Sequence, residues 1–229
     1  MNTVLHQTEM LQRFTQDSND TDYERAVTYC TNILATCPDS VQHNVLKCEY
    51  LLRAYKMKEA GQFSNDLMQN PVMQQVPIIK CWRGRIVCYC GNENLGKNIL
   101  TDALRSDPDL TDAMRTIKLL KVQATKKEEA SQIFKSNDFA QAIEAFDACL
   151  QIDPLHLTYN STICLNKAIC QVKLSKNEEA LKTLNLCLKM QPEYVKALVK
   201  RGEVYQNMEE WEEAVADYGK AASLDPAFP

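Results

Sequence analysis

Three of the six residues in the stretch KALVKR, residues 196–201, are cationic. Lys196 and Lys200 are four residues apart, so on an α-helix their side chains would lie on one face. Paired ammonium groups of this kind can hold carboxylates through charge-assisted hydrogen bonds. The formal net charge of the whole chain is −4, so this cationic face is a local feature that suggests an acidic ligand. The alternative is that both lysines are ordinary solvated surface residues.

Residues for catalysis, phosphate binding or metal binding are sparse. The six glycines form no phosphate-binding motif. The three histidines are far apart in the sequence: His6, His43 and His156. The best metal candidates are Cys81, Cys88 and Cys90, but on a helix Cys88 and Cys90 would point in different directions. Cysteine also occupies small packing positions elsewhere in the chain. We therefore expect no enzyme, no cofactor and no metal site.

The composition is that of a soluble folded protein, with 45% hydrophobic and 24% charged residues. An isoelectric point of about 5.5 argues against a nucleic-acid partner. The N-terminal sequence has no basic segment followed by an apolar run, and no apolar stretch is long enough to span a membrane. The ten cysteines show no repeated framework, which suits free thiols in a reducing compartment. The expected location is therefore the cytoplasm.

A repeat of about 34 residues is the main organising feature of the chain. Six of the eight prolines follow it: Pro38, Pro71, Pro108, Pro154, Pro192 and Pro226. A series of small residues precedes them: Ala26, Ala60, Gly96, Ala142, Ala180 and Ala214. In residues 195–228, two apolar stripes at helical spacing are separated by a polar turn, and Pro226 ends the second. We expect Gly202 to pack closely against Ala214 where the two helices cross.

This pattern resembles the tetratricopeptide repeat (TPR), which implies an all-α superhelical solenoid of about six helix-turn-helix repeats. The first predicted module covers residues 1–110 and the second covers residues 123–229. Within them, the repeats are 7–40, 41–74, 77–110, 123–156, 161–194 and 195–228. The step from Pro108 to Pro154 contains no Gly or Pro between them, so we predict a long connecting helix at residues 111–135. A flexible linker would need such residues.

The resemblance also implies a ligand. Many TPR cochaperones hold the EEVD tails of the 70- and 90-kDa heat-shock chaperones in a two-carboxylate clamp. The family pattern has Lys and Asn four apart in one repeat, Asn in the next, and two cations four apart in the third. The matching positions in this chain are Lys127, Ser131, Asn166, Lys196 and Lys200. Ser131 departs from the pattern, although its hydroxyl can still donate one hydrogen bond.

The equivalent positions of the first module carry no charge: Leu11, Thr15, Leu46, Ile78 and Trp82. Any ligand of that groove is therefore expected to make apolar contacts. The two-module layout resembles the TPR region of cytosolic J-domain cochaperones, but the sequence has no His-Pro-Asp tripeptide. The resemblance is thus to that region without its J-domain, as in a fragment or a relative that ends early.

Two alternatives to a chaperone-binding adaptor stay open. A purely structural TPR scaffold in a large assembly would bind no acidic C-terminal peptide. A metal or redox protein would use the cysteines and would retain zinc on purification.

Overall fold

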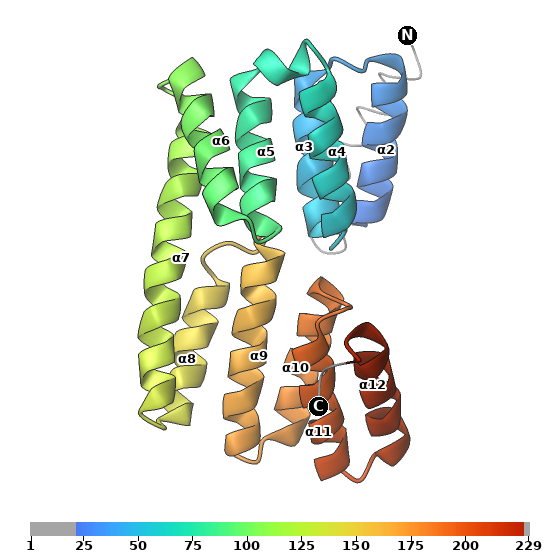
Figure 1. Ribbon diagram of the computed structural model, residues 1–229, viewed down its shortest axis with the longest axis vertical. Coiled ribbons are helices and arrows are strands. Elements are labelled where there is room, and N and C mark those ends of the chain that lie inside the picture. Colours follow the sequence, from blue (N-terminus) through green and yellow to red (C-terminus); the bar gives the residue numbers. More distant parts are fainter. Residues whose placement is uncertain (1–21, 227–229) are drawn as a thin grey trace. The chain divides into compact units, whose positions relative to one another are not determined.

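The computed structural model describes residues 22–226, and these residues form α-helices, one short 3-10 helix and connecting turns, with no strand. The predicted all-α class is confirmed for this part of the chain. Contacts divide the chain into two units, residues 1–117 and 118–229. Figure 1 shows the helices of each unit packed beside one another, with α4 in front of α3.

Within residues 22–117, the first unit contains five complete helices and the start of a sixth, with a short 3-10 helix between α4 and α5. Their bounds are α2 Tyr23–Thr36, α3 Val41–Arg53, α4 Met57–Gln69, η1 Met73–Gln75, α5 Pro77–Tyr89 and α6 Glu93–Ser106. Side chains of Asp22 and Asn92 accept hydrogen bonds from Arg25 N and Leu95 N, which caps α2 and α6. The predicted repeat 7–40 lies partly outside the described residues.

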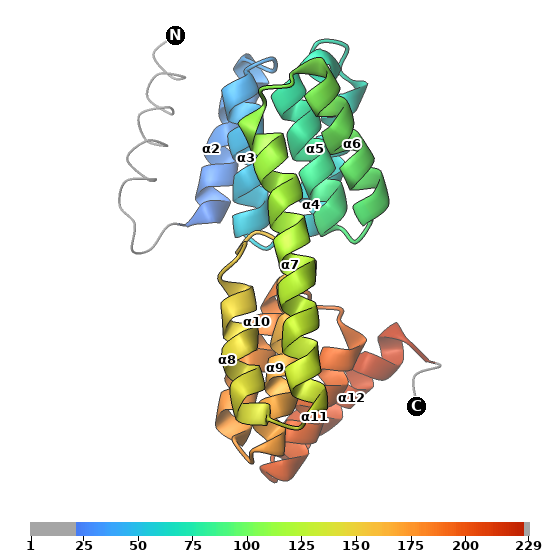
Figure 2. The same cartoon turned by 90° about the vertical axis from the view of Figure 1, so that its left-hand side faces the viewer.

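Helix α7, Thr111–Lys135, has 25 residues and coincides with the long helix predicted from the sequence. Figure 2 shows it as one unbroken helix. The remaining helices of the second unit are α8 Phe139–Leu150, α9 Leu157–Lys173, α10 Asn177–Met190, α11 Val195–Asn207 and α12 Trp211–Leu224. The grouping of these helices into the predicted modules stays a prediction.

The helices from α3 onward pair into hairpins, in which the first helices are α3, α5, α7, α9 and α11 and the second helices are α4, α6, α8, α10 and α12. The turn inside each of these five hairpins contains one residue with positive φ. These residues are Tyr55, Gly91, Asn137, Ser175 and Glu209. A left-handed backbone is easy for glycine but costs other residues about 1 kcal/mol. Four of the five turns accept that cost, which indicates that helix packing fixes the turn geometry.

Small residues allow the paired helices to approach closely. All six members of the small-residue series are buried in the structure. A Cβ atom built on Gly202 would lie 2.8–3.2 Å from ring atoms of Tyr218. A side chain added at Gly202 would therefore meet Tyr218 first, whereas the sequence analysis expected the close contact at Ala214.

The first helices of neighbouring hairpins form a layer of their own. α3 contacts α5 and α9 contacts α11, whereas no two second helices within residues 22–226 make comparable contact. Helices that lie closer together are on the inner side of a curved array. Within each unit the first helices therefore line the inner face.

Candidate functional site

The five predicted site residues lie on first helices of the second unit. Lys127 and Ser131 are on α7, Asn166 is on α9, and Lys196 and Lys200 are on α11. Ala130 of α7 shares a buried cluster with Ile163 of α9, so these two helices pack together. Since α9 also contacts α11, α9 touches both of the other helices that carry these residues.

Three of the five side chains have no polar partner within residues 22–226. Among the described residues, Lys127, Asn166 and Lys196 have side chains without a hydrogen bond or ion pair. Lys127 and Asn166 are partly buried, and Lys196 is exposed. An unpaired ammonium or amide group on an inner face can donate hydrogen bonds to an incoming carboxylate.

The other two side chains already have partners in their own helices. The Ser131 hydroxyl donates to the carbonyl oxygen of Lys127, at 2.7 Å. The Lys200 ammonium group forms an ion pair with the carboxylate of Glu203. Sequence spacing located both residues on their helices, but it gave no sign of these contacts.

A recurring cationic side chain joins neighbouring hairpins and was missed by the sequence analysis. It is the seventh residue of three predicted repeats and donates to the side chain of a residue on the second helix of the preceding hairpin. The three pairs are Arg83 with Asn65 Oδ1 (3.2 Å), Lys167 with Asp147 Oδ1 (2.5 Å) and Arg201 with Asn185 Oδ1 (2.7 Å). The sequence does show a cation at the seventh position of these three repeats, and this recurrence could have revealed the contact.

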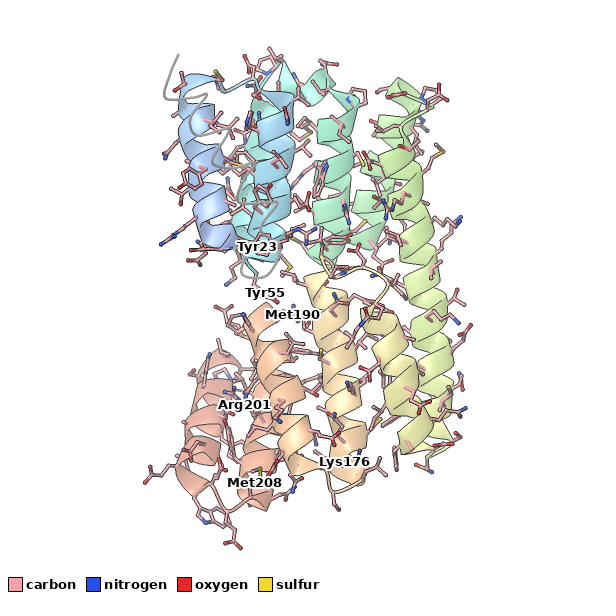
Figure 3. All side chains as sticks on the ribbon, turned by 180° about the vertical axis from the view of Figure 1, so that it is seen from behind. Tyr23, Tyr55, Lys176, Met190, Arg201 and Met208 are labelled. Carbon is pink, nitrogen blue, oxygen red and sulfur yellow. The ribbon has the colours of Figure 1, made fainter. Side chains whose placement is uncertain are left out.

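Arg201, part of the KALVKR stretch, is thus a packing residue. It also makes a two-pronged contact with Asp217 of α12, with both N–O distances 2.7 Å. The Asp217 side chain is only 7% exposed. Figure 3 labels Arg201 on α11 in the second unit. Its hydrogen bonds to Asp217 raise the already high pKa of Arg201, so this pair stays ionised.

We expect Arg201→Met to lower the free energy of unfolding by about 2 kcal/mol, because it leaves an almost buried carboxylate without its partner. Urea denaturation followed by circular dichroism measures the change. Lys126→Met is the control, since Lys126 pairs with Glu129 on the surface of α7, where both side chains are about half exposed. The control should change stability by less than about 0.5 kcal/mol. Equal effects of the two substitutions would contradict a packing role for Arg201.

The groove positions of the first unit are less open than the sequence suggested. Leu11 and Thr15 lie outside the described residues, and Leu46 and Ile78 are partly buried. Trp82 is only 8% exposed, and the Arg85 guanidinium lies 5.0 Å from the centre of its ring. A ligand here would meet a cation beside the aromatic ring as well as apolar side chains.

The two histidines within residues 22–226 are buried in separate places. His43 Nδ1 and the Ser40 hydroxyl share a hydrogen bond of 2.7 Å at the start of α3, and burial lowers the pKa of His43. His156 Nδ1 and Gln123 Oε1 are 2.8 Å apart, and the imidazole stacks on Tyr159. Both therefore help to fix helix ends. His6 lies outside the described residues.

All ten cysteines are free, and eight of them are buried. Burial raises the pKa of Cys81 to about 12 and that of Cys88 to about 11, so both thiols stay protonated at neutral pH. A protonated thiol is a poor nucleophile and a poor metal ligand. Within the described part of the chain, no group of three His, Cys, Asp or Glu residues is arranged to hold a metal ion. Residues 22–226 also contain no helix with the length and apolar character of a membrane span.

Comparison with protein families and known sequences identifies relatives. Residues 134–202 and 195–228 match two models described as tetratricopeptide repeat. The DnaJ homolog subfamily C member 7 homolog of Dictyostelium discoideum is 30% identical over 195 residues, covering 85% of this chain and 36% of the relative. Human DnaJ homolog subfamily C member 7 is 27% identical over 206 residues, covering 88% of this chain and 41% of the relative. The chain thus spans well under two thirds of these relatives.

Comparison with solved structures supports the same fold. The crystal structure of the P58(IPK) TPR domain has a TM-score of 0.52 and 21% sequence identity, and the match covers 98% of this chain and 63% of that one. At this level of identity the likeness concerns the fold alone.

Proposed function

We propose that the protein is a non-catalytic adaptor of the cochaperone type, because it carries tetratricopeptide repeats and is similar over most of its length to members of DnaJ homolog subfamily C. Its inner face in residues 123–228 binds peptides that end in a free carboxylate. The chemistry fits the acidic EEVD tails of the 70- and 90-kDa heat-shock chaperones. Free cysteines suit a reducing compartment, so we propose a cytoplasmic location.

The observation that carries this proposal is the set of unpaired donors on adjacent first helices. Lys127, Asn166 and Lys196 offer two ammonium groups and one amide that have no competing partner in the described part of the chain. An EEVD tail presents a terminal carboxylate and an Asp side chain. Each of these carboxylates needs donors to replace the water that it loses on binding.

Ser131 sets the strength of the interaction. Its hydroxyl donates to the carbonyl oxygen of Lys127 in the same helix. This bond is not needed to satisfy a buried acceptor, so the hydroxyl can give it up. It can turn toward a ligand and donate a single hydrogen bond. An amide at this position would reach farther, and we therefore expect Ser131→Asn to tighten binding.

A structural scaffold is the second candidate, and one observation favours it. On α12, Trp211 is 58% exposed and Val215 is 71% exposed, and the two side chains are one helical turn apart. Apolar side chains on an outer helix are typical of surfaces that contact other proteins. In a scaffold, such contacts would replace peptide binding on the inner face.

The test is a titration with an EEVD peptide that has a free C-terminus, beside the same peptide with a C-terminal amide. We expect the amide to bind at least about tenfold more weakly, because it lacks one charged acceptor. Lys196→Ala should weaken binding of the free acid by about tenfold for the same reason. Added salt should weaken the binding of the wild type, because exposed charges are screened.

Lys182→Ala is the matched control, since Lys182 is an exposed lysine on the second helix α10 and its loss changes the net charge equally. It should leave the affinity nearly unchanged. Lys167 is unsuitable as a control because it pairs with Asp147. Equal binding of free acid and amide would reject the carboxylate site and favour the scaffold.

A further inference from the structure

We infer that Glu203 is a built-in competitor for the ligand's carboxylate and sets the affinity of the inner face of the second unit. This inference rests on the proposed function. In the free protein the Glu203 carboxylate binds the Lys200 ammonium group, which is one of the five predicted donors. A ligand that uses Lys200 must first displace Glu203.

The position of Glu203 in its repeat supports this role. Glu203 is the ninth residue of the predicted repeat 195–228, and Ser131 is the ninth residue of the predicted repeat 123–156. Equivalent residues of successive repeats occupy equivalent faces of their helices. Glu203 therefore shares the inner face with the residues proposed to bind the peptide, one helical turn from Lys200.

Exposure and charge show why the pair matters for binding. The side chain of Lys200 is 25% exposed and that of Glu203 is 43% exposed, so the carboxylate lies on the side open to solvent and ligand. The structure gives Lys200 no second acidic partner, so Glu203 is its only counter-charge among the described residues. Glu203 thus neutralises one of the three lysine charges on this face and repels an acidic peptide.

The equivalent positions explain why this competitor is peculiar to one repeat. The ninth residue is Ser131 on α7 and Ile169 on α9, neither of which carries charge. Lys127 and Lys196 have no such partner among the residues that the structure describes. The competition is therefore confined to Lys200, and a single substitution can remove it.

The experiment compares Glu203→Gln with the wild type in titrations with the free-acid and amidated EEVD peptides. We expect Glu203→Gln to bind the free acid roughly fivefold more tightly, because Lys200 is released and one repulsive charge is removed. Glu179→Gln is the matched control: Glu179 pairs with Lys176 at the same sequence spacing, 3.3 Å apart, at the start of the second helix α10. It should change the affinity much less.

The outcomes separate this inference from the proposed function. If the wild type prefers the free acid but Glu203→Gln tightens binding no more than Glu179→Gln, the inference fails and the carboxylate site stands. If neither the wild type nor Glu203→Gln prefers the free acid, the proposed function fails and the inference fails with it. A gain specific to Glu203→Gln and to the free acid supports both.

Discussion

Replacing Gly96 with alanine should lower the free energy of unfolding by about 3 kcal/mol, because the added methyl group has no room. A Cβ atom built at this position would lie 2.3 Å from Cys88 Sγ, 2.6 Å from Gly84 O and 2.8 Å from Cys88 N. Two of these three atoms belong to the backbone of α5 and cannot turn aside as a flexible side chain would. The helices α5 and α6 must therefore separate to admit the alanine.

Gly219→Ala is the control and should act in the opposite direction. Gly219 lies within α12, and a Cβ atom built on it would meet no atom within 4 Å. Alanine there should stabilise the protein by about 1 kcal/mol through its better helix propensity. Urea denaturation of both variants measures the difference. A neutral Gly96→Ala variant would contradict the close crossing of α5 and α6.

The sequence predicted the fold because its signals recur in phase. The small residue of each second helix and the proline after it are local requirements, so they are visible without coordinates. The turn residues were not predictable in the same way. Tyr55 and Glu209 adopt positive φ, although their side chains disfavour that conformation, because the packed helices on either side impose it.

The candidate site was predictable only in part. Helical spacing and the family resemblance located Lys127, Asn166 and Lys196 on first helices. The engagement of Lys200 with Glu203 depends on side-chain conformation, which spacing does not encode. Arg201 lies beside Lys200 in the sequence and carries the same charge, yet it packs against Asp217 between helices. The contacts of each side chain, within its own helix or with neighbouring helices, therefore decide which of two adjacent cations is available to a ligand.

The largest expected effect is loss of the fold at alkaline pH, and the buried thiols are its cause. Burial raises the pKa of four cysteines from near 9 to about 12: Cys30, Cys48, Cys81 and Cys187. It raises the pKa of three others to about 11: Cys88, Cys164 and Cys170. In the unfolded chain these thiols ionise at ordinary values near 8.5. Between the two values the unfolded state holds fewer protons, so stability falls as the pH rises.

The stabilising effect of the protonated thiols is complete below the unfolded pKa and is lost as the pH rises toward the folded values. For each thiol, the free energy of unfolding falls by up to about 1.4 kcal/mol per pH unit in this window. Several such thiols acting together can offset the roughly 5–15 kcal/mol that holds a typical domain folded. We therefore expect helix content to collapse between about pH 9 and pH 11, measured by far-ultraviolet circular dichroism with a reductant present.

Lysine residues also lose their charge in this range, so a cysteine substitution must separate the two causes. Cys48 is fully buried. Cys48→Ala should reduce the slope of the unfolding free energy against pH by the amount that one proton contributes. The substitution should also lower stability at neutral pH, because it leaves a cavity. Substituting the exposed Cys37 by alanine should leave the slope unchanged. A pH dependence that is the same in the wild type and both variants would assign the alkaline transition to lysine and tyrosine titration. A fold that persists unchanged to pH 11 would contradict the burial of the thiols.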